Sequence, residues 1–191
     1  MESLSTFWLS VLLFLLIIAS AFFSASETSM MALNRYRLKA LSAKNNVQAK
    51  RVEKLLNKID YLIGGILLGN NFVNILAASI ATLLSLKLFG EGSVINASLV
   101  LTLVILVFAE NTPKTFAAKN PEKIALPASW ILEILIKIFK PLIYLISIIS
   151  KFILKLLGLK NVSKNILNSE ELRMAVKDSK SQMSKNYQNM L

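Results

Sequence analysis

The sequence predicts an all-α integral membrane protein with three transmembrane helices and amphipathic helices beside the membrane. First, 54% of its 191 residues are hydrophobic and the mean hydropathy is +0.57, which is too apolar for an ordinary soluble domain. Second, apolar runs at residues 7–33, 61–89 and 94–118 each exceed the ~20 residues that a helix needs to cross a bilayer. Third, the basic residues gather beside these runs, as the positive-inside rule describes.

The composition also limits the chemistry. The sequence contains no cysteine and no histidine, so a metal must be held by oxygen atoms, which favours hard cations such as Mg²⁺ or Ca²⁺. We find no nucleophile–base arrangement and therefore do not expect an enzyme. The net charge is +11. Because the basic residues flank the apolar runs, we expect them to contact the lipid bilayer rather than nucleic acid.

The first apolar run is expected to stay in the membrane as a helix. Its only early charge is Glu2, whereas a cleaved signal peptide begins with basic residues. Residues 35–60 follow with eight Lys or Arg side chains and predict an amphipathic, partly helical connection lying against the inner leaflet. Its apolar stripe comprises Leu38, Leu41, Val52, Leu55, Leu56 and Ile59.

The distribution of basic residues gives one consistent topology. The turn at residues 90–93 has no Lys or Arg, whereas Lys114, Lys119 and Lys123 end the third run. We therefore expect a plasma (inner) membrane protein with its N-terminus outside and its C-terminus in the cytoplasm.

Residues 128–158 predict two juxtamembrane helices. Glu133, Lys137 and Lys140 share one helical face, which we interpret as solvated, and Pro141 is expected to break the run. A fourth span or a re-entrant hairpin is the alternative. Residues 1–160 then form a transmembrane domain, and residues 161–191 a polar cytoplasmic helical tail.

Polar residues interrupt all three spans at a similar depth. With a rise of ~1.5 Å per residue, Ser24, Asn70 and Glu110 lie about 16, 15 and 13 Å from the basic ends of their helices. An ionisable residue at membrane depth marks an ion or proton pathway by default. Hydroxyl, amide, carboxylate and freed carbonyl oxygens suit a small hard cation, so we predict one intramembrane oxygen-ligand site.

Neighbouring residues have predicted roles around this site. Ser20, Ser24 and Glu27 share a face of the first helix, and Asn74 shares a face with Asn70, whereas Asn71 is offset. Pro113 is expected to widen or kink the third helix, and Lys114 to pair with Glu27 or Glu110. The alternatives are structural: interhelical hydrogen bonds for Asn71 and Asn74, backbone hydrogen bonds for Ser26 and Ser29, and a plain Glu110–Lys114 ion pair.

Three segments together resemble the transmembrane domain of the CorB/CorC and cyclin M family of Mg²⁺ transport proteins. They are Phe22-Phe23-Ser24-Ala25-Ser26-Glu27-Thr28, Gly69-Asn70-Asn71-Phe72-Val73-Asn74 and Glu110-Asn111-Thr112-Pro113-Lys114. The resemblance implies a homodimer of three-span subunits with juxtamembrane helices. It also implies that Mg²⁺ is bound by Ser20, Ser24, Asn70, Glu110 and the carbonyl of Gly69.

The chain departs from the family pattern in three places. Ala109 stands where the family favours glycine, and lysines dilute the acidic helix expected within residues 168–191. Family members normally continue into CBS domains that bind ATP. Because the sequence lacks them, we expect an excised domain or a naturally short version, with ATP relevant only where those domains exist.

Magnesium ion transport across the membrane, by efflux or Na⁺-coupled exchange, is the function this combination predicts. One alternative is an accessory or sensor membrane protein that binds Mg²⁺ without transporting it. The other is a haemolysin-like membrane protein, a label that some relatives carry.

Overall fold

The computed structural model describes residues 2–156, and this part of the chain is helical without any strand. The predicted all-α fold class is confirmed. The elements in order are α1 (Glu2–Ala32), α2 (Arg35–Ala43), α3 (Val47–Leu56), α4 (Ile59–Phe89), the 3₁₀ turn η1 (Glu91–Ser93), α5 (Val94–Val104), the π-helical segment η2 (Ile105–Asn111), α6 (Thr112–Lys119) and α7 (Pro121–Leu156).

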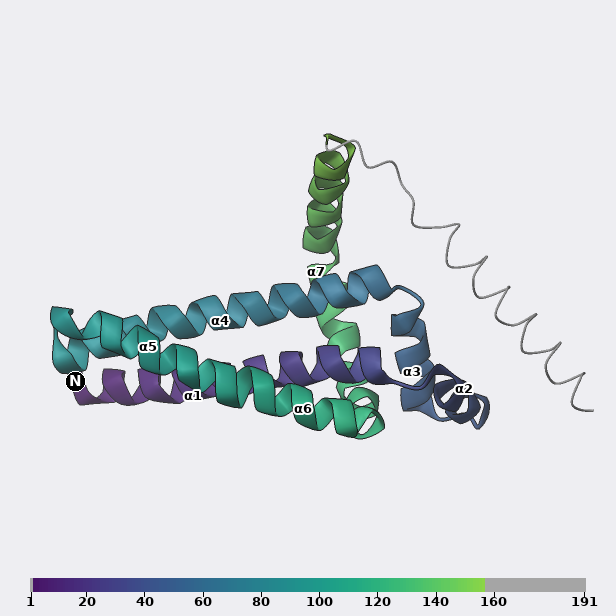
Figure 1. The fold of residues 1–191 in the computed structure, drawn as a ribbon, viewed down its shortest axis with the longest axis horizontal. Coiled ribbons are helices and arrows are strands. Elements are labelled where there is room, and N and C mark those ends of the chain that lie inside the picture. The colour runs from purple at the N-terminus through teal and green to yellow at the C-terminus, as the bar shows by residue number, and fades with distance from the viewer. Residues whose placement is uncertain (1, 157–191) are drawn as a thin grey trace, which may run out of the picture. The chain divides into compact units, whose positions relative to one another are not determined.

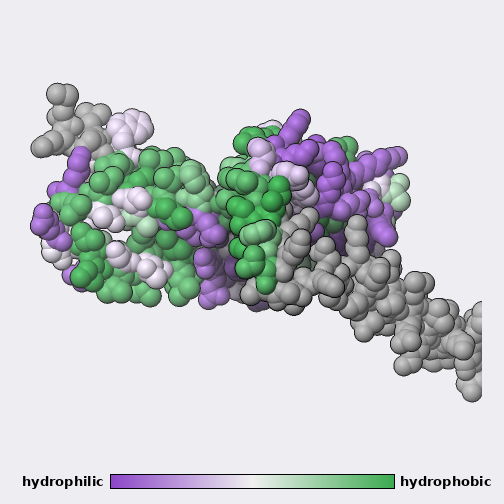
Figure 2. All heavy atoms as spheres, turned by 90° about the horizontal axis from the view of Figure 1, so that it is seen from above, coloured by the Kyte–Doolittle hydropathy of each residue, from purple (hydrophilic) through white to green (hydrophobic). Residues whose placement is uncertain are grey.

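Three helical stretches are long and apolar enough to cross a membrane, as predicted. They are Thr6–Ala32, Ile59–Phe89 and Glu91–Lys119, the last comprising η1, α5, η2 and α6. Large apolar side chains such as Phe14, Phe72 and Leu103 are about 60% exposed, and apolar surface covers much of the face seen in Figure 2. This is the surface that lipid solvates, so the chain is an integral membrane protein.

Helix α1 is the element against which the other spans pack. It contacts α4, η2 and α6, while α4 contacts α5. Figure 1 shows these segments running side by side. Polar groups on α1 can therefore meet groups on both other spans.

Two short helices, α2 and α3, connect the first span to the second, and asparagine side chains begin both. The Asn34 side chain accepts hydrogen bonds from the backbone N–H groups of Tyr36 (3.0 Å) and Arg37 (3.1 Å). Asn46 accepts one from Ala49 N–H (3.0 Å). Each asparagine thus satisfies N–H groups that the first helical turn leaves without a partner.

The apolar stripe of this connection lies inside the protein. Leu38, Val52, Leu55 and Leu56 are buried, while Leu41 packs against them from a partly buried position. They form one cluster with residues of α1, α4 and α7, including Phe23, Met30, Leu62, Ala125 and Leu132. The expectation that the stripe lies against the lipid leaflet is wrong, because neighbouring helices cover it.

Helix α7 differs from the prediction at Pro141. It continues through both Pro127 and Pro141, so Pro141 does not end a helix. Glu133 stays partly exposed on the face interpreted as solvated, and there it pairs with Lys54 (2.7 Å) and Arg51 (3.3 Å) of α3. A second ion pair joins Arg37 to Glu122 (2.8 Å). These contacts attach the beginning of α7 to the α2–α3 connection.

The chain divides into two compact units, residues 1–143 and 144–191. The first contains the three spans, α2, α3 and most of α7, and the described part of the second is the end of α7. The predicted tail at residues 161–191 lies outside the described residues, and the predicted homodimer stays a prediction.

The Glu133 ion pairs predict a small pH-dependent stabilisation. The hydrogen bond and positive charge of Lys54 lower the pKa of Glu133 from 4.5. A lowered folded-state pKa adds stability above pH 4.5 that is lost as the pH falls through the folded value. The pair is partly exposed, so Glu133→Gln should lose less than about 1 kcal/mol at pH 7. Thermal unfolding in detergent should show the variant and wild type converging at low pH; a constant difference down to pH 3 would contradict this.

Candidate cation site

A buried polar pair joins the first two spans. Ser20 of α1 donates a hydrogen bond to the side-chain oxygen of Asn70 on α4, at 3.1 Å. Ser20 is 1% exposed and Asn70 is 9% exposed. Depth counting placed Asn70 level with Ser24, whereas its actual partner is one turn away on the same face of α1. Both residues are predicted cation ligands, and the structure brings them into contact.

The absence of a side chain at Gly69 allows the two helices to approach. A Cβ built at Gly69 would lie 2.5 Å from Cζ and 2.6 Å from Cε1 of Phe23. Such distances are too short for any side chain, so the Phe23 ring occupies the space that only glycine leaves free. Gly69 therefore has a packing role beside its predicted role as a carbonyl ligand. Phe23 has no polar atom, and for that reason no ligand pattern in the sequence indicated it.

The third span widens where Glu110 lies. Residues Ile105–Asn111 form the π-helix η2, and the N–H of Thr112 bonds the carbonyl of Val107 five residues earlier. Pro113 follows and has no N–H to give to a carbonyl in the preceding turn. The predicted widening next to Pro113 is confirmed. Single π-helical turns within α-helices are frequent at functional sites because they expose carbonyls and re-aim side chains.

The widened segment is in contact with α1. Ser24 is fully buried and donates a hydrogen bond of 3.5 Å to the backbone carbonyl of Glu110. Ala109 is also fully buried. A small residue is thus accommodated where the related family favours glycine. Glu110 itself is half-buried, and it contacts α1 through its backbone carbonyl.

A looser ion pair lies on the cytoplasmic side expected from the sequence. Lys114 Nζ is 3.9 Å from the carboxylate of Glu27. Of the two carboxylates considered for Lys114, the structure pairs it with Glu27. The Glu110 carboxylate is therefore without an ion pair among the described residues, and its charge is available to a cation.

The remaining polar candidates separate into distinct positions. Asn71 is exposed, whereas Asn74 is half-buried and its buried side-chain oxygen has no hydrogen-bond partner among the described residues. Ser29 donates to the carbonyl of Ser26 at 3.0 Å, which confirms its predicted backbone bond. The same prediction for Ser26 is wrong, because its buried hydroxyl has no hydrogen-bond partner in the described part of the chain.

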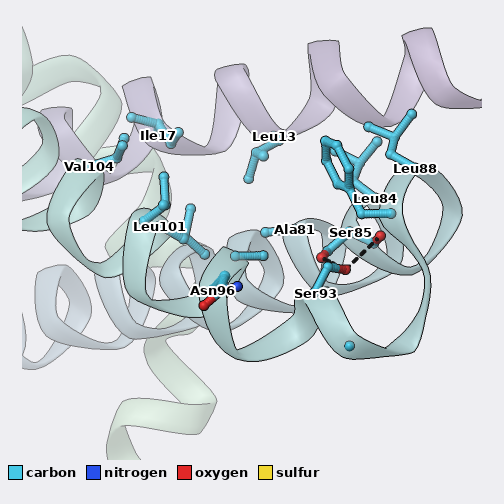
Figure 3. Close-up of a pocket in the computed structure, with 14 residues that line it drawn as sticks. Leu13, Ile17, Ala81, Leu84, Ser85, Leu88, Ser93, Asn96, Leu101 and Val104 are labelled. Atoms are coloured by element: carbon cyan, nitrogen blue, oxygen red, sulfur yellow. Dashed lines mark hydrogen bonds between the residues drawn. The ribbon is translucent and has the colours of Figure 1, made fainter.

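An apolar cavity of about 800 Å³ lies elsewhere, between α1, α4 and α5. Figure 3 shows Ile17 of α1 near Val104 and Leu101 of α5, while Ser85 and Ser93 lie at the other end of the cavity, at the α4–α5 turn. Ser85 and Ser93, whose hydroxyls are 2.5 Å apart, bond each other across that turn. Among the described residues, no ionisable side chain lines this cavity, so this lining lacks the charge that a cation site needs.

The donor set is dominated by neutral oxygen atoms. Among the described residues, no group of three or more His, Cys, Asp or Glu side chains is placed to hold a metal. Ser20, Ser24 and Asn70 offer hydroxyl and amide oxygens, and Glu110, whose backbone carbonyl accepts from Ser24, carries a carboxylate. Oxygen donors of this kind suit Mg²⁺ and other hard cations and disfavour softer metals.

Comparison with known proteins identifies this arrangement of spans. The family model described as the cyclin M transmembrane N-terminal domain matches residues 11–186. The chain belongs to this family. Members of the family are commonly membrane transporters. The resemblance in the three polar segments is therefore confirmed at the level of the family.

Three relatives of this cyclin M domain are informative. The UPF0053 inner membrane protein YfjD of Escherichia coli (strain K12) is 48% identical over 174 residues, which cover 90% of this chain and 41% of YfjD. A UPF0053 protein of Haemophilus influenzae is 44% identical over 179 residues, covering 93% and 43%. The polyamine export protein of H. influenzae is 27% identical over 175 residues, covering 82% and 39%. The chain thus spans about two-fifths of the length of these relatives.

The packing at Gly69 gives a prediction with an internal control. Gly69→Ala should destabilise the protein by about 1–3 kcal/mol, because its Cβ overlaps the Phe23 ring. In Gly64→Ala the nearest atom is the Ile143 methyl at 3.4 Å, an ordinary contact, so stability should stay within about 1 kcal/mol of wild type. Thermal unfolding in detergent measures both, and equal losses in the two variants would contradict the role given to Gly69.

Proposed function

We propose that this cyclin M domain transports Mg²⁺ across the membrane, with the ion bound between α1, α4 and η2. The observation that carries the proposal is the contact of Ser20 with Asn70 and of Ser24 with Glu110 in one buried region. These residues come from all three candidate spans. A site whose ligands come from three spans can open to one side of the membrane or the other when the packing of those spans changes.

The proposed ligands are Ser20, Ser24, Asn70, Glu110 and the carbonyl of Gly69. A small cation at membrane depth has lost most of its water, so oxygen atoms of the protein must replace that water. Glu110 supplies the negative charge, and the neutral oxygens complete the shell without adding repulsion between carboxylates. Because Lys114 lies beside Glu27, it balances that carboxylate on the path to the site and does not neutralise Glu110.

The membrane context follows the predicted topology. We propose an inner-membrane location with the basic α2–α3 connection and α7 on the cytoplasmic side, since basic residues are retained there. YfjD, which is named an inner membrane protein, is consistent with that location. We further propose a homodimer and treat Na⁺ as the candidate coupling ion, as the family resemblance implies.

Glu110→Gln tests the proposal because it removes one charge and keeps the shape of the side chain. Purified wild-type protein in liposomes should transport Mg²⁺, measured with a trapped fluorescent indicator. The Mg²⁺ flux of the variant should be at least tenfold lower. Glu91→Gln is the matched control, since Glu91 lies in the exposed turn η1 and should leave flux unchanged. Wild-type flux in a folded Glu110→Gln protein would refute the assignment.

The same assay separates the alternatives. Mg²⁺ binding without any flux would favour an accessory or sensor protein, and release of an uncharged dye would favour a haemolysin-like protein. Both outcomes contradict transport through the site.

Polyamine export is a second candidate function, because one relative is named a polyamine export protein. A polyamine is a flexible chain of ammonium groups, and it would pair with Glu110 and donate hydrogen bonds to Asn70 and Ser20. A long organic cation needs more room than a dehydrated ion. The buried Ser20–Asn70 contact therefore favours Mg²⁺.

Competition distinguishes the two cargoes. We expect a tenfold excess of spermidine to reduce Mg²⁺ flux by less than half, because the close α1–α4 contact excludes a chain of methylene groups. Radiolabelled spermidine uptake into the same liposomes provides the direct measurement. Spermidine uptake that Glu110→Gln abolishes, together with absent Mg²⁺ flux, would assign polyamine export instead.

A further inference from the structure

A second cavity, of about 670 Å³, lies where α3 passes into α4 and is closed by α7. Part of its wall is apolar, as at Leu62 and Ile136, and its charged lining residues are four lysines and two acids. All of its lining residues belong to the first compact unit. It shares no residue with the proposed cation site, so it requires a separate explanation.

The charges around this cavity do not cancel. Glu133 is already paired with Lys54 and Arg51. Lys58, Lys137 and Lys140 remain, and Asp60 is the other acidic residue of the lining. Within the described part of the chain, no ion pair joins any of these three lysines to a carboxylate. The cavity therefore presents an excess of positive charge to whatever enters it.

The cavity also lies at a defined level of the membrane. Ile59, which lines it, is the first residue of the second candidate span. Tyr61 lines it as well, and tyrosine is enriched where lipid headgroups meet the hydrocarbon. Lipid headgroups therefore have access to its lysines at the edge of the span.

We propose that this cavity binds the headgroup of an anionic phospholipid, with the phosphate among Lys58, Lys137 and Lys140. The acyl chains would follow the apolar wall at Leu62 and Ile136 into the hydrocarbon. Basic pockets between helices on the cytoplasmic side of membrane proteins bind such lipids through this combination of charge and apolar surface. A soluble anion would satisfy the lysines and leave the apolar wall uncovered. The proposal does not depend on which cation the protein transports.

Thermal unfolding with added lipid tests the proposal on the full chain in detergent. A ligand that binds the folded state raises the unfolding temperature, so phosphatidylglycerol should raise it and phosphatidylcholine should not. Lys58→Gln/Lys140→Gln should lose at least half of that shift. Lys137→Gln/Lys140→Gln serves as a second variant where the first unfolds without lipid, as judged by circular dichroism.

Lys39→Gln/Lys44→Gln is the matched control, because it removes the same charge at exposed positions in and just after α2 that do not line the cavity. It should keep the full phosphatidylglycerol shift. An equal loss in the control would indicate diffuse attraction and overturn the proposal. A phosphatidylcholine shift as large as that of phosphatidylglycerol, or the same shift with inorganic phosphate alone, would also overturn it. Loss of Mg²⁺ transport in Glu110→Gln leaves this result unaffected.

Discussion

The close approach of α1 and α4 at Phe23 and Gly69 is the constraint on which the site depends. The ring lies where any side chain at position 69 would stand, and this closeness brings Ser20 within hydrogen-bond distance of Asn70. Polar side chains in hydrocarbon are costly when left without a partner. The Phe23–Gly69 contact therefore permits the Ser20–Asn70 hydrogen bond. That hydrogen bond in turn offsets the cost of burying the two polar side chains.

The third span contacts α1 through the widened π-helical segment η2. Pro113 cannot continue the ordinary pattern of backbone bonds, and η2 is widened immediately before it. This widened segment places the carbonyl of Glu110 against Ser24, with Ala109 buried beside it. Backbone and side-chain oxygens thus meet in a region where a membrane helix normally presents only apolar groups. Among the described residues, the buried side-chain oxygen of Asn74 and hydroxyl of Ser26 have no hydrogen-bond partner.

Much of the fold was readable from the sequence because bilayer thickness determines helix length. Hydropathy alone predicted the three spans, and proline chemistry predicted the change in helix geometry beside Glu110. The depth count predicted that Ser24 and Glu110 lie at one level, and the two residues are in contact. It also put Asn70 level with Ser24, whereas Asn70 bonds Ser20, one turn away on α1. Counting residues at a constant helical rise gives the depth of a residue in the membrane to within about one turn. Which residue on the neighbouring helix becomes its partner is decided by how the helices pack.

The errors arose where a tertiary partner decided the outcome. The stripe that includes Leu38 and Val52 looks like a lipid-facing surface in the sequence, but helices distant in sequence cover it. Proline is also a weaker stop signal than expected here, since α7 continues through Pro141. Phe23 could not be predicted as a site residue, because its role is to fill the space above a glycine.

The most direct test of the central claim is an experimental structure determined in Mg²⁺. Mg²⁺ is bound with oxygen distances of about 2.0–2.1 Å, and we expect such distances to the Glu110 carboxylate and to Ser20, Ser24 and Asn70. Ion density at this place that disappears in Glu110→Gln would establish the site. A saturating Mg²⁺ concentration that leaves these oxygens hydrogen-bonded only to one another, with the ion bound elsewhere, would contradict it.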